Sequence, residues 1–365
     1  MAEIAVPKAA ARRGFFGRFN LEVRGHMPIA QQVLVVSAGI LLGLLLSALL
    51  LIASGVKPSG LANEFIVAIF SSKRNVAAVL SYAAPLTIVG LAATLAFKAR
   101  FWNIGIEGQI IFGAIGATLV ANSDFGPASM RIVTMALAAM VAGMLWIALP
   151  LFLKIRLQVN EIISTLLMNY IAFNFLLHLL YGSWKDPQSA FPNSKLFDDV
   201  ERLMPVGWQN LNLSVPIAIV LVLCVAWLLG MSRYGFLLNF VYSNARMARA
   251  MGVRIAGLTV LFALASGALS GFGGFMISTG IESRLTQSFF IGYGFSGILI
   301  AFLARNNPFA VAFFAILIAV LMVAGQSLQV FYQIPFAMVQ LIQAIIVICV
   351  AASEFFIHYR IRMVG

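Results

Sequence analysis

Long runs of apolar residues, separated by short polar segments, set the pattern of this chain. Ten runs approach the length of a membrane span, at roughly 33–56, 79–97, 104–121, 132–153, 161–181, 213–230, 257–279, 291–304, 308–328 and 336–357. A helix needs about 20 apolar residues to cross the hydrocarbon core of a bilayer. The pattern therefore predicts an all-α polytopic membrane protein with about ten transmembrane segments. The eighth run is short and glycine-rich, and predicts either a broken or re-entrant helix or a full crossing.

The composition changes the picture by excluding other protein classes. Hydrophobic residues make up 62% of the 365 positions and charged residues 10%, whereas a soluble domain carries about 25% charged residues. Disorder, a disulfide scaffold and a soluble cytosolic enzyme are all disfavoured. The formal net charge of +12 would suggest nucleic acid in a soluble protein. We expect no nucleic-acid partner here, because so apolar a chain leaves no room for a basic soluble surface.

The basic residues are divided unequally between the two sides of the predicted spans. If the N-terminus is cytoplasmic, 16 of the 24 Lys and Arg residues lie on the cytoplasmic side, and the other eight are Lys57, Lys73, Arg74, Arg131, Lys185, Lys195, Arg202 and Arg284. Such a bias is typical of membrane proteins. Together with an even number of spans, it predicts that both termini are cytoplasmic.

The predicted organisation is a basic cytoplasmic N-terminal arm at 1–30, a transmembrane domain at 31–358 and a cytoplasmic tail at 359–365. Two connections within the domain are long, an outer loop at 182–212 and a cytoplasmic loop at 231–256. The arm interleaves arginines with Phe15, Phe16 and Phe19, so it either lies on anionic membrane lipid or forms a disordered tail.

The chain carries no signature of its own energy source. It has no G-x-x-x-x-G-K-[ST] phosphate loop and not even a Gly-Lys pair. We therefore expect no enzyme activity and no cofactor on this chain, and the spacing of its histidines and cysteines indicates no metal site. Only Glu107 among ionisable residues lies well within a span. This scarcity favours a pore-forming subunit driven by another protein over an ion-coupled secondary carrier, which retains several such groups.

Two polar groups interrupt the apolar pattern. The third span opens with Asn103, Glu107 and Gln109, which fall within two helical turns, and the fifth opens with Asn160, Glu161, Thr165 and Asn169. In the fifth span the last three recur every four residues and share one helix face. Each group is either part of a translocation path or an interhelical hydrogen-bond clamp.

Glycine-rich segments mark two further spans. The sequence GYGFSG at 292–297 interrupts a regular helix, and irregular backbone at membrane depth is either buried in protein or lines a cavity. Tyr293 and Phe295 are therefore candidates for the path, with anchoring at the membrane interface as the alternative. The small residues of SGALSGFGG at 266–274 predict close helix packing.

The cytoplasmic loop 231–256 contains four arginines and no acidic residue. Ala245, Ala248, Met251 and Gly252 can share one face of a short helix, with the arginines on other faces. The loop is either ordinary positive charge on the cytoplasmic side or a short surface helix that docks into a cytoplasmic partner.

Four stretches resemble the permease subunits of ATP-binding-cassette (ABC) importers, in the branch of ribose and branched-chain amino-acid permeases. They are similar above all to nucleoside permeases that work with binding proteins of the basic-membrane-protein type. The stretches are APLTIVGLAATLAFKARFWNIGIEGQIIFGAIGA at 84–117, VNEIISTLLMNYIA at 159–172, MARAMGVRI at 247–255 with SGALSGFGG at 266–274, and GYGFSGILIAFLARNNPFAV at 292–311.

The resemblance implies a multi-pass subunit of the bacterial cytoplasmic (inner) membrane that imports nucleosides or related purine compounds. It also implies three partners: a cytoplasmic ABC ATPase that binds ATP and magnesium, a second, usually non-identical permease chain, and an extracytoplasmic substrate-binding protein that docks on the outer loops. By the same resemblance, the ATPase-coupling residues are Asn244, Arg246, Ala248, Arg249 and Gly252. A ribose-like sugar or another small polar solute is the alternative cargo for this machinery, and an ion-coupled secondary transporter is the alternative of a different class.

Overall fold

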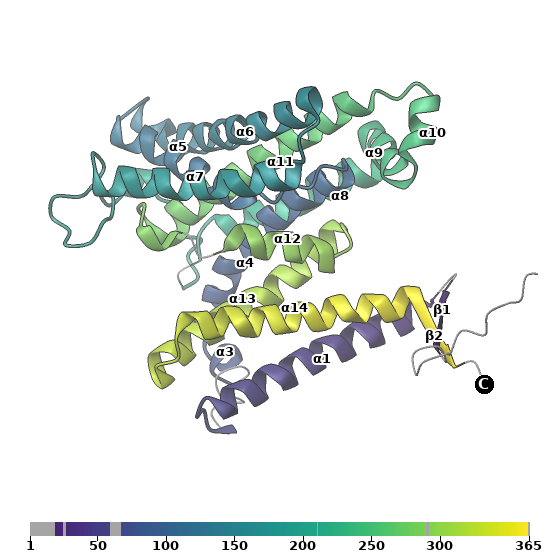
Figure 1. Cartoon of the computed structure of the whole chain (residues 1–365). Helices are drawn as coiled ribbons and strands as arrows, with labels where there is room; N and C mark the ends of the chain where they lie inside the picture. Colours follow the sequence, from purple (N-terminus) through teal and green to yellow (C-terminus); the bar gives the residue numbers. More distant parts are fainter. Residues whose placement is uncertain (1–18, 25–26, 59–66, 210, 290–291, 364–365) are drawn as a thin grey trace, which may run out of the picture. The chain divides into compact units, whose positions relative to one another are not determined.

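The computed structural model describes residues 19–24, 27–58, 67–209, 211–289 and 292–363. Its helices follow the ten apolar runs of the sequence (Figure 1), as α1 Ile29–Ala53, α4 Lys73–Lys98, α5 Ile106–Asn122, α6 Arg131–Leu157, α7 Glu161–Tyr181, α8 Ser214–Met231, α11 Ile255–Ile277, α12 Tyr293–Leu303, α13 Pro308–Tyr332 and α14 Phe336–His358. Within these described ranges, eight helices are long and apolar enough to cross a membrane, and α5 and α12 are shorter apolar helices. The expected class and the expected number of about ten segments are confirmed.

The eighth apolar run forms helix α12, which has only 11 residues. At about 1.5 Å per residue it is about 16 Å long, roughly half the thickness of the hydrocarbon core. Gly292 precedes it with a φ of 81°, a left-handed conformation that favours glycine. Beyond it, the Asn307 side chain accepts hydrogen bonds from two backbone amides at the start of α13. The run therefore forms a helix that is too short to span the hydrocarbon core by itself, as the broken or re-entrant alternative predicts.

The two long connections lie at opposite ends of the helices. Helices α9 Arg233–Ser243 and α10 Ala245–Ala250 occupy the loop predicted to be cytoplasmic, and α3 Ala68–Ser71 precedes α4. Figure 1 places α9 and α10 at one end and the teal loop that follows α7 at the other. Which end faces the cytoplasm, and the cytoplasmic location of both termini, stay predictions.

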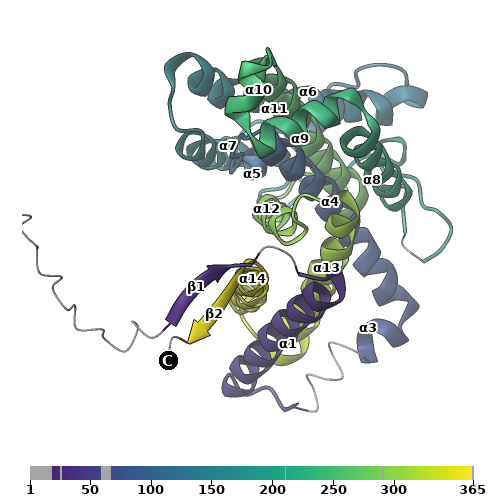
Figure 2. The same cartoon turned by 90° about the vertical axis from the view of Figure 1, so that its right-hand side faces the viewer.

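The chain divides into two compact units, the larger one being Val56–Val339. The smaller unit contains α1, most of α14 and a two-stranded antiparallel sheet of β1 Phe19–Val23 and β2 Tyr359–Met363 (Figures 1 and 2). In the part of the chain that the structure describes, this sheet is the one exception to the all-helical expectation. Local periodicity could not reveal it, because its strands come from opposite ends of the sequence. Residues 1–18 of the predicted arm lie outside the described residues.

Helix α4 forms the centre of the larger unit. Every residue from Ala83 to Phe97 is buried, and α11, α13, α12 and α8 pack around it (Figure 2). An apolar membrane helix can face either lipid or protein, and helices that pack closely in a bilayer are rich in small residues. The alanines and the glycine between Ala83 and Phe97 give α4 such a surface, in keeping with its central place.

Glycines bring α5, α6 and α11 into close contact. A Cβ atom added at Gly113 would collide with the backbone of Gly271, and one added at Gly143 would lie 2.9 Å from the Cα of Gly271. Such contacts at small residues replace the hydrophobic driving force that is missing between helices in a bilayer. The close packing expected for the segment 266–274 is confirmed.

Candidate functional site

A pair of buried carboxamides lies where α5 begins. Asn103 Nδ2 donates to Gln109 Oε1 at 3.0 Å, and Gln109 Nε2 donates back to Asn103 Oδ1 at 2.9 Å. Asn103 Nδ2 also lies 3.1 Å from the hydroxyl of Ser266 on α11. All three side chains are at most 1% exposed. The pair therefore satisfies itself and ties α5 to α11.

Helix α7 holds the same segment from the other side. Asn169 Oδ1 accepts from the backbone amide of Gly108 at 2.8 Å, while its Nδ2 donates to the carbonyl of Ile104 at 2.9 Å. The hydroxyl of Thr165 accepts from the amide of Ile104 at 3.2 Å. The bond to Gly108 occupies an amide that a helix start leaves without an intrahelical partner, and the bonds to Ile104 hold the segment that leads into α5. Thr165 and Asn169 share one face of α7, as their spacing predicts.

The first turn of α7 carries the other two predicted residues of this group. The Glu161 carboxylate forms a salt bridge with Lys154 and lies 3.5 Å from the amide of Trp102. Lys154 also donates to the carbonyl of Arg100 at 3.0 Å. Asn160 is exposed and caps α7 by accepting from the amide of Ile162 at 2.8 Å. Glu161 thus joins this network from a partly buried position, whereas Asn160 does not.

Glu107 connects this network to the short helix α12. Its Oε2 accepts from the amides of Gly294 at 2.5 Å and Phe295 at 3.3 Å. A carboxylate at a helix N-terminus interacts favourably with the helix dipole. The second oxygen, Oε1, and the neighbouring Tyr293 hydroxyl are both buried and make no hydrogen bond within the described structure. Phe295 is 38% exposed.

Apart from Asn160, the predicted path residues therefore lie in a set of contacts between α5, α7, α11 and α12. Asn103, Gln109, Thr165 and Asn169 have the geometry of an interhelical clamp in this conformation, since their polar atoms are used within the protein. A role of these residues in translocation stays a prediction. Glu107 and Tyr293 differ from them, because each retains a buried polar atom without a partner.

The predicted coupling loop forms a short helix with an exposed basic surface. Asn244 caps α10 by accepting from the amide of Met247 at 3.0 Å, and Ala248 of the same helix is fully buried. Arg246 and Arg249 are exposed. Gly252 follows with a φ of 81°, which lets the chain turn into α11.

Two hydrogen bonds that the sequence did not reveal join this loop to the end of α4. Lys98 Nζ donates to Asn239 Oδ1 at 2.8 Å, and Arg100 Nη2 donates to the carbonyl of Tyr242 at 2.8 Å. Their partners lie more than 140 residues further along the chain. The only sequence signal for these bonds was the position of two basic residues at the end of a span. The general excess of Lys and Arg on the cytoplasmic side of membrane proteins already explains that position.

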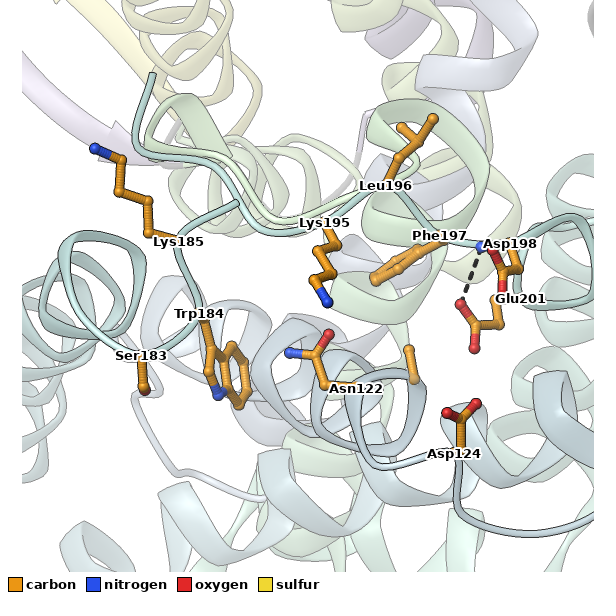
Figure 3. Close-up of a pocket in the computed structure, with 11 residues that line it drawn as sticks. Asn122, Asp124, Ser183, Trp184, Lys185, Lys195, Leu196, Phe197, Asp198 and Glu201 are labelled. Carbon is orange, nitrogen blue, oxygen red and sulfur yellow. Dashed lines mark hydrogen bonds between the residues drawn. The ribbon is translucent and has the colours of Figure 1, made fainter. Parts of the chain in front are cut away.

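A cavity of about 520 Å³ lies at the opposite end, between the end of α5 and the loop that follows α7 (Figure 3). Figure 3 shows Lys195 pointing into it, with Trp184 and Asn122 on its walls. Among the residues described, neither the Lys185 nor the Lys195 side chain makes a salt bridge or hydrogen bond. The cavity is therefore lined by two lysines that are not neutralised by direct contact.

A buried arginine orders the acidic side of this cavity. Arg131 lies 2.7 Å from Asp124 and 3.3 Å from Glu201, and the side chains of Arg131 and Glu201 are 8% and 7% exposed. The sequence predicts that all three lie on the outer side but not that they pair, because Glu201 is 70 residues from Arg131. A buried ion pair of this kind fixes the outer loop on the start of α6.

Comparisons with known proteins indicate the family. The sequence model of one protein family, the permease component of branched-chain amino acid transport systems, matches residues 75–351 of this chain. A glucose ABC transporter permease of Haloferax volcanii is 33% identical over 333 residues, covering 88% of each chain. A guanosine ABC transporter permease of Bacillus subtilis is 29% identical and covers 91% of this chain and 95% of its own length. A nucleoside ABC transporter permease of Lactococcus lactis is 27% identical, over 80% and 83% of the two chains.

Permeases of ABC transporters are transport subunits that work with ATPase and substrate-binding partners. The family match covers most of the chain and includes nearly all of its predicted spans. The chain therefore belongs to the family of branched-chain amino acid transport system permease components, and it is a multi-pass protein of the cytoplasmic membrane.

Proposed function

We propose that this chain is the permease subunit of an ABC importer for nucleosides or related purine compounds. The observation that carries the proposal is its similarity, over most of both chains, to permeases named for guanosine and for nucleosides. The chain would contribute the solute path, while ATP binding and hydrolysis would take place on a cytoplasmic partner. The missing phosphate loop supports this division of labour.

Helix α10 is the proposed contact for the ATPase. Its exposed arginines would face acidic groups on that partner, and Ala248 seats the helix on the rest of the protein. A groove of about 460 Å³ beside it, lined in part by Arg233, Met251 and Arg254, offers a complementary hollow. Movement of the ATPase would be transmitted through α10, because the neighbouring α9 is bonded to the end of α4.

From α9 the motion has a continuous route to the centre of the protein. Arg100 bonds the end of α9, and its own carbonyl accepts from Lys154. Asn103 follows in the same loop and bonds α11, while Glu107 holds the start of α12. ATP-driven movement would thus shift the relative populations of two arrangements of α5, α11 and α12.

The cavity of about 520 Å³ around Lys195 is the proposed docking place for the substrate-binding protein. Lys185 and Lys195 offer positive charge that a carboxylate of the partner would neutralise, which is the kind of complementarity that speeds docking and fixes its orientation. A second permease chain, expected to be non-identical, would complete the solute path.

The test is uptake by the assembled transporter. Co-expression with its ATPase, binding protein and second permease, followed by reconstitution in liposomes, should give ATP-dependent uptake of radiolabelled guanosine or adenosine. The purified chain alone should give none. Transport by this chain alone, driven by an ion gradient, would instead identify a secondary carrier and refute the proposal.

A simple sugar is the second candidate cargo, because the relative that is 33% identical is named for glucose. The same liposomes distinguish the two. Competition of guanosine uptake by excess nucleosides but not by glucose or ribose supports the first candidate. Uptake of glucose or ribose that nucleosides leave unchanged supports the second.

A further inference from the structure

A second cavity of about 620 Å³ lies on the predicted outer side, beside the outer half of α7. Its wall is formed by Phe173 of α7, by Phe191 and Asn193 of the outer loop, and by residues of the segment that joins α11 to α12. The outer loop and the joining segment are pinned together by the bridge between Asn193 and Thr286. The volume falls within the range of cavities that hold small organic ligands.

The chemistry of the wall favours a neutral, hydroxylated solute. The Glu282 carboxylate and the Arg284 guanidinium both line the cavity and balance each other in charge. Neither forms a salt bridge or hydrogen bond with any part of the chain that the structure describes. The Glu282 carboxylate is thus available to accept a hydrogen bond and the Arg284 guanidinium to donate one, to hydroxyl or ring-nitrogen groups of a solute. A solute with a net charge would be repelled by one of these two side chains.

The cavity wall also offers carboxamide groups and aromatic rings to a solute. The Asn193 side chain makes no hydrogen bond in the described ranges, and Gln287 uses its Oε1 for the Tyr181 hydroxyl at 3.4 Å, which leaves its Nε2 available. Phe191 is 71% exposed, and an exposed ring offers a face on which a base can stack. Hydrogen-bonding amides beside aromatic rings suit a heterocycle joined to a polyol.

The backbone around the cavity is also unusual. Glu282 ends the π-helical turn Ser278–Glu282 that extends α11, and Ser283 follows with a φ of 56°. π-Helical turns occur frequently at functional sites. Here the turn carries Glu282 out of the helix and into the wall of the cavity.

A polar strip on α7 continues from the cavity toward the other end of the helix. Tyr170, Asn174 and His178 are exposed and spaced by four residues, so they share one face. Tyr181 follows in the next turn and bonds the cavity residue Gln287. Polar residues on a membrane helix ordinarily face a cavity, a water-filled path or another protein chain, because lipid cannot hydrogen-bond them.

We propose that this cavity is a receiving site for the solute, in which a nucleoside released by the binding protein is held before it passes along α7. The base would stack on Phe191, and the ribose hydroxyls would bond Glu282 and the amide of Asn193 or Gln287. This assignment rests on the proposed nucleoside import. It concerns a different place from the docking cavity around Lys195.

The first test compares transport with ATP consumption in the fully assembled transporter. Glu282→Gln and Phe191→Ala should each lower the amount of guanosine imported per ATP hydrolysed by at least about fivefold, while stimulation of the ATPase by the binding protein stays within about twofold. Phe125→Ala is the matched control, since Phe125 is 67% exposed on an outer turn but lines neither cavity. Phe191→Ala removes an exposed ring, so failure to fold is not expected for it.

The second test locates the nucleoside directly. The assembled transporter without binding protein is irradiated with 8-azidoguanosine, digested with trypsin and analysed by mass spectrometry. Label in the peptides 186–195 or 285–305, competed by guanosine, is the expected result.

The outcomes separate this proposal from the general function. Suppose that the wild-type transporter imports guanosine. Unchanged transport per ATP in both variants would then overturn the receiving site alone, and so would label confined to other peptides. Loss of ATPase stimulation in Phe191→Ala assigns the cavity to docking instead, and overturns the proposal. Absence of nucleoside uptake by the wild-type transporter contradicts the proposed function, and with it the nucleoside as occupant of this cavity.

Discussion

The reciprocal pair of Asn103 and Gln109 provides a quantitative test of the clamp at the start of α5. Asn103→Ala removes both hydrogen bonds to Gln109 and the bond to Ser266. It leaves the Gln109 carboxamide buried without partners, at a cost of about 1–3 kcal/mol for each unsatisfied group. With a donor and an acceptor stranded, we expect a loss of about 2–5 kcal/mol in the free energy of unfolding.

The double variant separates the pair from its surroundings. Once Gln109→Ala is also present, no carboxamide remains to be stranded, so the two substitutions together should cost about 1–3 kcal/mol less than the sum of the single changes. Asn122→Ala is the control, because Asn122 is exposed and its side chain makes no hydrogen bond within the described residues. It should change stability by no more than about 0.5 kcal/mol.

The assay is reversible unfolding in mixed detergent micelles, followed by the circular dichroism of the helices. Additive single and double variants would refute the reasoning, since they would mean that Asn103 and Gln109 do not depend on each other. A cost for Asn103→Ala no larger than that for Asn122→Ala would refute it as well.

Three further substitutions test other parts of the structure and a fourth tests the outer surface. Arg249→Glu reverses an exposed charge on α10 and should lower uptake at least about tenfold, with membrane insertion and basal ATP hydrolysis unchanged. Unchanged uptake per ATP would mean that the arginines of this loop only set the membrane orientation of the chain. Gly271→Leu drives a side chain into the backbone of α6 and should remove the peak of folded protein in size-exclusion chromatography. Gly230→Leu is the control and should be tolerated, because no atom lies within 4 Å of the position of its Cβ. Glu107→Ala removes two bonds to the start of α12 and should cost about 2–4 kcal/mol of unfolding free energy, with Glu107→Gln closer to wild type; equal losses would contradict the proposed hydrogen bonding. Lys195→Glu should weaken binding-protein affinity measured by surface plasmon resonance, most strongly at low salt, and an unchanged affinity would place docking elsewhere.

The route from α10 to α12 gives a physical meaning to the few polar residues in an apolar chain. Arg100, Asn103 and Glu107 lie within one short loop and the first turn of α5, yet they contact α9, α11 and α12 respectively. A polar group in a membrane domain is costly unless it is paired. Each of these residues is paired with a different helix, so a displacement of the loop changes the contacts of all three helices.

The sequence by itself determined the helices of this protein. The apolar runs predicted ten segments whose positions the structure confirms, because the need to satisfy backbone hydrogen bonds in a bilayer leaves a helix as the only option for such runs. The shortness of α12 and the close packing near Gly271 were also local properties, visible in glycine content and spacing. The shared face of Thr165 and Asn169 followed from a spacing of four residues.

Only the tertiary structure decided which polar groups meet. Asn103 and Ser266 are separated by 163 residues, and Glu107 and Gly294 by 187. Because hydrogen bonds act over about 3 Å, they depend on the packing of whole helices, and no local pattern encodes that packing. The same holds for the β1–β2 sheet and for the cavity beside α7, whose wall comes from three separate segments. Hydropathy sets where each helix runs, and the few polar contacts between helices set how they are joined.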